Sequence, residues 1–282
     1  MPRALITGGT GGLGSELAPR FAAAGYSVRI LSRRPRLPRA DPAHEWTQAD
    51  LVAGTGLAEA VAGCDMIMHC ATNAPLGKGD PQATRNLCAA AKEAGGMHLF
   101  YISIVGIDKI PMPYYKAKLA CERVLEDSGV PWTVLRAVQF HSLIDMMLKA
   151  FTRVPGLMLM PPSGSRFQSM DTGEVADRML AYAKDGQTGR LPDLGGPEYQ
   201  TLGQMATTWL EVRGMRRLRV PLPFFGKIVQ GFRRGYNCVP GSPREPSPGA
   251  TGLSENTDPD RAWPKNISHI LLLAHVTHTQ AR

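Results

Sequence analysis

The chain opens with an apolar strand that runs directly into a glycine-rich turn, and this junction constrains the fold more than any other feature. Within the first fourteen residues, Gly8, Gly11 and Gly14 are spaced G-x-x-G-x-x-G. Such a turn needs glycine because a Cβ would block the bend, the approach of a pyrophosphate and the packing of the next helix. Free N–H groups at the helix N-terminus then attract phosphate. The sequence predicts a dinucleotide-binding turn, and a tight strand–helix turn without a ligand is the alternative.

Short apolar runs alternate with helical patterns through the first half of the chain. Strands are expected at residues 4–7, 27–32, 65–71, 98–103 and 132–136, with helices at 12–24, 57–62, 83–94 and 114–128. Apolar strands that alternate with helices are typical of a parallel sheet covered on both faces. Right-handed crossovers make this an α/β fold, a doubly wound Rossmann sheet that binds ligands at the carboxyl ends of its strands.

The pattern changes after residue 136, so we expect a Rossmann domain at 1–136 and a small C-terminal substrate lobe at 137–236. Helical patterns in the lobe cover 139–152, 172–184, 202–213 and 226–234, and residues 189–196 look extended. From residue 237 the sequence is rich in Pro, Ser, Gly and polar residues. Such a composition buries little apolar surface, so 237–282 is expected to be a disordered or loosely packed tail.

The chain carries 32 Lys and Arg against 24 Asp and Glu, a formal net charge of +8. A basic excess suits a phosphate-rich cofactor, and it also occurs in proteins that bind nucleic acid or anionic membranes. Basic and aromatic residues lie side by side between residues 213 and 234. We interpret this stretch as a solvated face with a lid over the substrate pocket, rather than a membrane or nucleic-acid surface.

Five cysteines without C-x-x-C spacing argue against a disulfide framework or a zinc site, and no metal is expected. The chain begins with a core strand in place of a signal peptide, and its apolar runs are too short to span a bilayer. The expectation is a cytoplasmic monomer or homodimer without a nucleic-acid partner or stable membrane association.

The end of the second expected strand indicates which dinucleotide binds. NAD-binding versions of this fold carry an acidic residue there that holds the ribose hydroxyls. Here the residues are Ser32, Arg33 and Arg34. Two guanidinium groups and a hydroxyl can bind a 2′-phosphate, which an Asp would repel, so NADP(H) is predicted. Further on, Asp50 has two interpretations, an acceptor for the adenine amino group or the N-cap of the helix at residue 57.

A Y-x-x-x-K pattern joins Tyr114 and Lys118 on the helix expected at 114–128. Residues four apart lie on one helix face, so the phenol and the ammonium can share a cavity. A neighbouring Lys⁺ is expected to lower the pKa of Tyr114, which would then act as a general acid. Ser103 ends the strand at 98–103, so its hydroxyl could join Tyr114 over a substrate carbonyl.

These features make the chain resemble the short-chain dehydrogenase/reductase superfamily. It is most similar to the atypical branch with NmrA-like members, which shares the cofactor turn of the extended, epimerase-like enzymes. The resemblance covers about residues 3–236. It rests on the glycine turn, Ser32-Arg33-Arg34, His69-Cys70-Ala71-Thr72, Ser103-Ile104-Val105-Gly106, the Y-x-x-x-K pattern and Leu135-Arg136-Ala137.

The resemblance implies a role for each candidate residue. Tyr114 becomes the proton donor, Lys118 binds the nicotinamide ribose and tunes Tyr114, and Ser103 orients the substrate carbonyl. Phe140 or Gln139 is expected near the nicotinamide, and Ala71 and Thr72 along the cofactor. The full set of expected cofactor-binding residues is Gly8, Thr10, Gly11, Gly12, Leu13, Gly14, Ser32, Arg33, Arg34, Asp50, Leu51, Ala71, Thr72, Lys118 and Phe140.

The Y-x-x-x-K pattern favours an NADP(H)-dependent oxidoreductase that transfers hydride to or from a carbonyl or quinone-like small molecule. One alternative is an NmrA-like redox sensor that binds NADP(H) without catalysis. A nucleotide-sugar epimerase or dehydratase is a further option, although the lobe shows no nucleotide-diphosphate signature.

Overall fold

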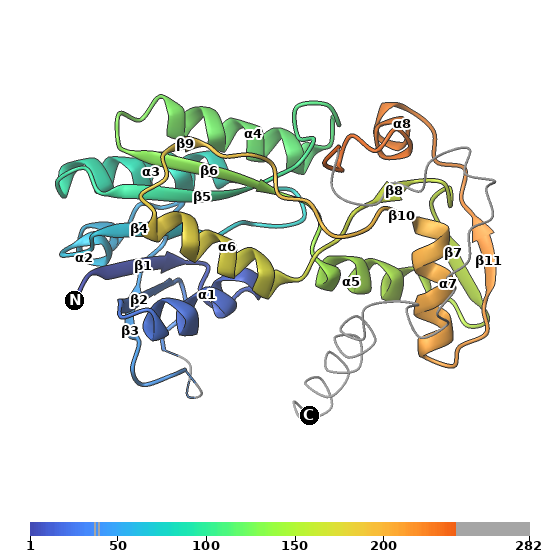
Figure 1. The fold of residues 1–282 in the computed structure, drawn as a ribbon, viewed down its shortest axis with the longest axis horizontal. Coiled ribbons are helices and arrows are strands. Elements are labelled where there is room, and N and C mark those ends of the chain that lie inside the picture. The colour runs from blue at the N-terminus through green and yellow to red at the C-terminus, as the bar shows by residue number, and fades with distance from the viewer. Residues whose placement is uncertain (37, 39, 241–282) are drawn as a thin grey trace, which may run out of the picture.

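A seven-stranded parallel sheet forms the centre of the computed structural model, which describes residues 1–36, 38 and 40–240 (Figure 1). The strand order is β3-β2-β1-β4-β5-β6-β9, so the chain reverses direction across the sheet between β1 and β4. The strands are β1 (Arg3–Thr7), β2 (Ser27–Ser32), β3 (Glu45–Gln48), β4 (Met66–His69), β5 (His98–Ile104), β6 (Trp132–Ala137) and β9 (Gly189–Arg190). The predicted doubly wound Rossmann sheet is confirmed.

Helices cover both faces of the sheet because alternate strand residues point to opposite sides. Ile6 belongs to the apolar cluster under α1 (Gly12–Ala23) and α6 (Thr172–Lys184), which lie side by side in Figure 1. Leu5 belongs to the opposite cluster, under α2 (Leu57–Val61), α3 (Asp80–Glu93) and α4 (Pro113–Glu126). Each face of the sheet is therefore covered by its own set of helices.

A smaller lobe lies at the opposite end of the molecule from the N-terminus (Figure 1). Its helices α5 (His141–Phe151) and α7 (Leu202–Val212) share an apolar cluster with β7 (Leu157–Met160) and β8 (Arg166–Phe167). Strand β7 pairs in parallel with β11 (Leu218–Pro221), and β8 pairs with β10 (Gln200–Thr201), before the short α8 (Lys227–Arg233). None of the helices in the described ranges combines the length and apolar character of a bilayer crossing.

The division expected at residue 136 is only partly followed. After leaving the sheet at β6 the chain returns to it twice, with α6 packed against α1 and with β9 paired to β6. The structure also differs from the loose tail expected from residue 237. Asn237 is fully buried, and its Nδ2 donates to Gln139 Oε1 at 3.1 Å and to the Arg166 carbonyl at 2.9 Å. The remainder of that predicted tail, residues 241–282, lies outside the described residues.

The turn between β1 and α1 is tight because glycine lets three stretches of backbone approach one another. Gly8 has a φ of +70°, and a Cβ there would lie 2.8 Å from the Ala71 backbone at the end of β4. A Cβ on Gly14 would lie 2.3 Å from the Gly8 carbonyl oxygen. On Gly12 it would meet nothing within 4 Å. Two of these glycines thus serve packing, and the third borders open space.

A buried ion pair fixes α4 to the sheet. Both Nε and Nη2 of Arg136, on β6, donate to the Glu122 carboxylate, at 2.8 and 2.6 Å. Nη1 of Arg136 reaches Asp108 at 3.1 Å. A bidentate arginine–carboxylate pair sets orientation as well as distance. Glu122 lies one turn beyond Lys118, so the pair also fixes the helix that carries Tyr114.

We predict that Gly14→Ala lowers the free energy of unfolding by about 1–3 kcal/mol, because the new methyl group overpacks against backbone that cannot yield. The exposed Gly12→Ala is the matched control, since its methyl group enters open space. Urea unfolding of both variants measures the difference. Equal stability of the two variants would contradict the packing role of Gly14.

We predict that Glu122→Ala lowers the free energy of unfolding by about 3–5 kcal/mol, because it leaves Arg136 as a buried charge without its main partner. Glu126→Ala on the same helix removes an exposed carboxylate and is expected to cost less than about 0.5 kcal/mol. Chemical unfolding followed by circular dichroism compares the two, and similar losses would argue against the pair.

Candidate functional site

The N-terminus of α1 has the features of an anion-binding site. Gly11 is its N-cap residue and donates its own N–H to the Gly8 carbonyl at 2.9 Å, and no side chain caps the helix. Thr10, Gly11 and Gly12 are exposed, whereas Leu13 is buried beneath them. The first N–H groups of a twelve-residue helix, together with its dipole, therefore face the space that Gly12 leaves open. This geometry fits a pyrophosphate.

Beneath this turn the carboxyl ends of β1 and β4 are joined by hydrogen bonds. Thr7 Oγ1 lies 2.8 Å from His69 Nδ1 and accepts from the Ala71 N–H at 3.2 Å. His69 Nε2 lies 3.2 Å from Thr84 Oγ1. Burial, with a smaller effect of the Lys118 charge, lowers the pKa of His69 to about 3, so its ring is neutral at physiological pH. This histidine is a structural link, and Ala71 borders the turn as expected.

At the end of β2 the structure fixes the backbone and leaves the guanidinium groups free. The Arg34 N–H donates to Ser32 Oγ at 3.1 Å. The Arg34 and Arg33 carbonyls accept from Trp46 Nε1 at 3.0 Å and from Gln48 Nε2 at 3.1 Å. Both arginine side chains are exposed, and neither has an ion-pair partner in the part of the chain that the structure describes. They are available to a phosphate.

Asp50 stabilises its own turn. Its Oδ1 accepts from the N–H groups of Val52 at 2.8 Å and Ala53 at 3.1 Å. The interpretation of Asp50 as the N-cap of the following helix is wrong, since the N-cap of α2 is Gly56, a left-handed residue six positions on. Contact with an adenine stays a prediction for Asp50, as it does for Leu51, whose side chain is buried.

The hydroxyl of Tyr114 belongs to a short chain of hydrogen bonds. It lies 3.1 Å from Thr72 Oγ1, which donates to Asp80 Oδ2 at 2.5 Å. Asp80 is buried, and its Oδ1 accepts from the Asn73 N–H at 2.9 Å. Because Thr72 gives its own proton to Asp80, its oxygen can accept the proton of Tyr114. The chain thus orients the phenol at the carboxyl end of β4.

The expected lowering of the Tyr114 pKa is wrong for this structure. Burial raises the pKa of Tyr114, the Thr72 hydrogen bond opposes the rise, and the Asp80 charge adds to it. Lys118 does not offset this, because its Nζ donates to the Ile102 carbonyl at 2.8 Å and lies 4.4 Å from the centre of the Tyr101 ring. Burial also lowers the pKa of Lys118. Both residues keep their predicted places on one helix, but the ammonium is directed at β5.

The hydroxyl of Ser103 does not bond to Tyr114. It is buried near the end of β5 and has no hydrogen-bond partner within the described ranges. A buried hydroxyl without a partner is unusual in a folded protein. The structure thus brings Thr72, and not Ser103, to the phenol, and the orienting role expected of Ser103 stays a prediction.

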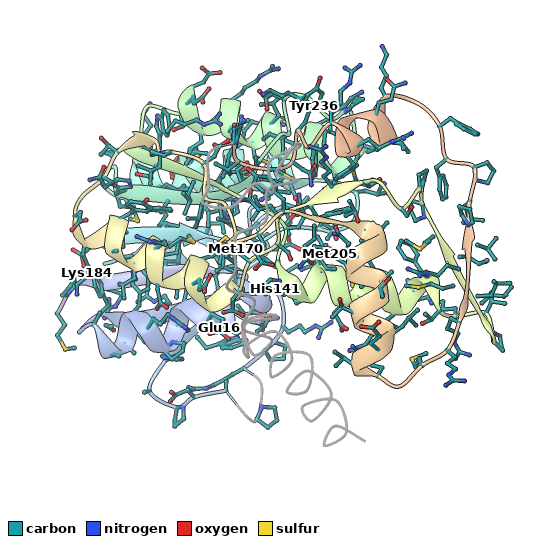
Figure 2. All side chains as sticks on the ribbon, turned by 45° about the vertical axis from the view of Figure 1, so that its right-hand side comes forward. Glu16, His141, Met170, Lys184, Met205 and Tyr236 are labelled. Atoms are coloured by element: carbon teal, nitrogen blue, oxygen red, sulfur yellow. The ribbon has the colours of Figure 1, made fainter. Side chains whose placement is uncertain are left out.

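After β6 the chain carries the two residues expected near the nicotinamide. Gln139 is buried and donates through Nε2 to the Tyr115 hydroxyl at 3.1 Å. Phe140 is the N-cap residue of α5 and pairs through its backbone with Met170, which Figure 2 shows beside His141 where the lobe meets the sheet. Contact between Phe140 and a cofactor is not tested by this packing. Among the described residues, no cluster of three or more metal-ligating side chains occurs.

Two residues of the site are not predicted from the sequence. Asp80 anchors the Thr72–Tyr114 chain, and Thr7 joins the two central strand ends. A carboxylate in the first turn of the helix that follows the fourth strand was a usable signal for Asp80. No local signal marks Thr7, because a threonine at a strand end is ordinary.

Comparison with known proteins identifies the family. A model of NAD(P)H-binding domains matches residues 8–143. A reductase of Streptomyces griseus, (4-alkanoyl-5-oxo-2,5-dihydrofuran-3-yl)methyl phosphate reductase, is 31% identical over 214 residues, 74% of this chain and 73% of the relative. Quinone oxidoreductase 2 of Escherichia coli is 28% identical over 209 residues, 71% of each chain.

Solved structures show the same fold at low sequence identity. A nucleoside-diphosphate-sugar epimerase from Staphylococcus aureus superposes with a TM-score of 0.69 at 18% identity, over 84% of this chain and 91% of its own. The UDP-glucose 4-epimerase of Thermotoga maritima gives a TM-score of 0.67 at 16% identity, over 80% and 87%. Glycine turn, strand order and relatives agree, and the chain belongs to the atypical, extended-type branch of the NAD(P)-binding short-chain dehydrogenase/reductase superfamily.

Proposed function

We propose that this protein is an NADP(H)-dependent oxidoreductase that reduces a carbonyl or quinone-like substrate. The proposal rests on the chain of hydrogen bonds from Tyr114 through Thr72 to Asp80. Thr72 follows Ala71, whose backbone packs against Gly8 in the glycine turn, so the phenol and the turn lie at the same end of β4. A phenol held there can serve as a proton donor beside a cofactor that binds at the switch point of the sheet.

The cofactor preference is argued from charge. Ser32, Arg33 and Arg34 place two unpaired guanidinium groups and a hydroxyl where NAD-specific proteins carry a carboxylate. An arginine can bind a 2′-phosphate through charge-assisted hydrogen bonds. We therefore assign NADP(H) to this chain, with the pyrophosphate at the N-terminus of α1.

The residues divide the work of the reaction as follows. Bound NADPH supplies the hydride. The phenol of Tyr114 is protonated at neutral pH, because burial raises its pKa from an ordinary value that is already well above neutrality, so it carries a proton for the substrate oxygen. Thr72 and Asp80 fix the position of the phenol. The Ile102 carbonyl holds Lys118 over the Tyr101 ring, where its ammonium adds positive charge on the β5 side of the site. Lys118 is the residue that we expect to bind the nicotinamide ribose.

The relatives support the substrate class. One carries the name of a reductase of a phosphorylated oxo-dihydrofuran and another that of a quinone oxidoreductase. Each of these names describes reduction of a conjugated or oxidised small molecule. The likeness to sugar-nucleotide epimerases concerns the fold alone, since those structures are below 25% identical.

A second function, an NADP(H)-binding redox sensor without turnover, is favoured by two observations at the site. Ser103 is buried with an unpartnered hydroxyl, and the Lys118 ammonium is bound to a protein carbonyl. A site in this arrangement binds a cofactor while lacking the serine contact to a substrate. Turnover by the unmodified protein across a panel of carbonyls and quinones decides between the two functions.

We predict that Arg33→Ala weakens NADPH binding roughly 10- to 100-fold and leaves NADH binding unchanged, because it removes charge-assisted bonds to the 2′-phosphate alone. Isothermal titration with both cofactors measures the effect. Arg85→Ala, an exposed arginine on α3, is the control and should bind both as the unmodified protein does. Equal losses for NADPH and NADH would reject the assignment of Arg33.

We predict that Tyr114→Phe reduces kcat by about 10²–10⁴-fold, because the proton donor is lost while the ring remains. NADPH affinity should stay within a few-fold of the unmodified value, which separates catalysis from binding. Tyr182→Phe on α6 is the matched control, and its kcat should not change. Full turnover by Tyr114→Phe would exclude this residue as the acid.

A further inference from the structure

One stretch of the small lobe, residues 212–234, concentrates positive charge without compensation. It contains no acidic residue and seven basic ones: Arg213, Arg216, Arg217, Arg219, Lys227, Arg233 and Arg234. Arg213 is paired with Asp145 at 2.7 Å. The other six have no ion-pair partner within the described ranges. Uncompensated cations along one segment give the surface that it forms a positive potential.

The same stretch also exposes apolar side chains. Of the eleven large apolar residues exposed in the described chain, five lie between residues 212 and 228: Val212, Leu218, Phe224, Phe225 and Ile228. Phe225 is 87% exposed and follows Phe224 directly. Single exposed apolar residues are ordinary, but two adjacent exposed phenylalanines within a basic segment indicate an interaction site.

The lid over the substrate pocket that the sequence predicts for this segment stays a prediction, and Phe224 and Phe225 within it are exposed to solvent. Its two ends are nevertheless held firmly. Strand β11 pairs with β7, and Phe232 of α8 stacks on Phe167 with ring centres 5.4 Å apart. The loop between β11 and α8 runs along the outer end of the lobe, where side chains project outward (Figures 1 and 2).

We propose that residues 212–234 form a docking surface for a bilayer that contains anionic lipids. Phenylalanine is stabilised at the boundary between headgroups and acyl chains, and Lys and Arg are attracted to anionic headgroups. The loop between β11 and α8 supplies the phenylalanines, and the flanking β11 and α8 supply basic side chains such as Arg219, Lys227 and Arg233. Two copies of this surface would bring like charges together, which disfavours a homodimer through it. An adjacent Phe pair flanked by aliphatic Leu218 and Ile228 suits acyl chains better than a nucleic-acid backbone.

The docking surface is physically connected to the candidate site. Phe232 contacts the ring of Tyr115 at 6.4 Å between centres, and Tyr115 precedes the helical turn that carries Lys118. A docked molecule would hold its site close to the bilayer, where apolar quinones dissolve. This last step rests on the proposed function, whereas the docking does not.

Co-sedimentation of the full chain with vesicles tests the proposal. Vesicles of phosphatidylcholine and phosphatidylglycerol in equal parts are compared with phosphatidylcholine alone. The unmodified protein should bind the anionic vesicles, and added salt should weaken that binding. Arg233→Gln with Arg234→Gln should weaken binding roughly 30-fold, from the loss of two cations near the surface. In added salt the apolar contact remains, because salt screens only the charges. The Phe224→Ser, Phe225→Ser variant should therefore bind the anionic vesicles more weakly than the unmodified protein does at the same salt concentration.

Matched controls test whether loss of binding is specific to residues 212–234 or follows from any loss of positive charge or apolar surface. Arg85→Gln with Lys92→Gln removes two exposed cations from α3, and Val52→Ser removes an exposed apolar side chain remote in sequence. Both should bind vesicles as the unmodified protein does. Thermal unfolding and NADPH titration of every variant establish that it is folded.

Several results would overturn the proposal. Absence of binding to anionic vesicles at low salt would do so, as would full binding by the Phe224→Ser, Phe225→Ser variant. Binding to duplex DNA in place of vesicles, lost in the Arg233→Gln, Arg234→Gln variant, would reassign the surface to nucleic acid. A dimer in sedimentation that the Phe224→Ser, Phe225→Ser variant abolishes would reassign it to a second copy. Since vesicle binding requires no turnover, each of these outcomes leaves the proposed reductase function to be decided separately.

Discussion

The close approach of backbone at Gly8 is the constraint on which the rest of the site depends. A Cβ at this position would collide with Ala71, so the turn after β1 and the end of β4 meet only because the residue is glycine. That contact places the N-terminal end of α1 and the Thr72 hydroxyl at the same edge of the sheet. Thr72 then reaches Tyr114, which comes from a helix more than forty residues later. One glycine thus joins the cofactor turn to the phenol.

Burial determines the protonation states around that phenol. It raises the pKa of Tyr114 and lowers the pKa values of His69 and Lys118, since each neutral form avoids desolvation of a charge. The consequence is a tyrosine that stays protonated at neutral pH, as the proposed role of proton donor requires. An acid activated by a nearby ammonium would need Lys118 to turn from the Ile102 carbonyl toward Tyr114.

The sequence predicts the β1–α1 junction and the doubly wound sheet because these depend on local patterns, the glycine spacing and the alternation of strands with helices. It does not predict that α6 returns to pack on α1, because the apolar face of a helix does not specify which other element will cover it. Composition also misleads at residue 237, where a polar side chain is buried by specific hydrogen bonds to Gln139 and Arg166. The hydrogen bond between Thr72 and Asp80 could not be predicted either, because it depends on the path of the loop between β4 and α3.

The segment from β11 to residue 240 connects the surface of the lobe to its centre. It exposes Phe224 and Phe225, contributes Phe232 to the ring contact with Tyr115, and carries Asn237, which donates to Gln139. Gln139 also bonds the hydroxyl of Tyr115, the residue next to Tyr114. A shift of this segment would therefore act on Tyr115 and Gln139, both of which it contacts. Through these contacts its exposed outer half is linked to the helix that carries Tyr114, so the surface of the lobe and the candidate site have to be considered together.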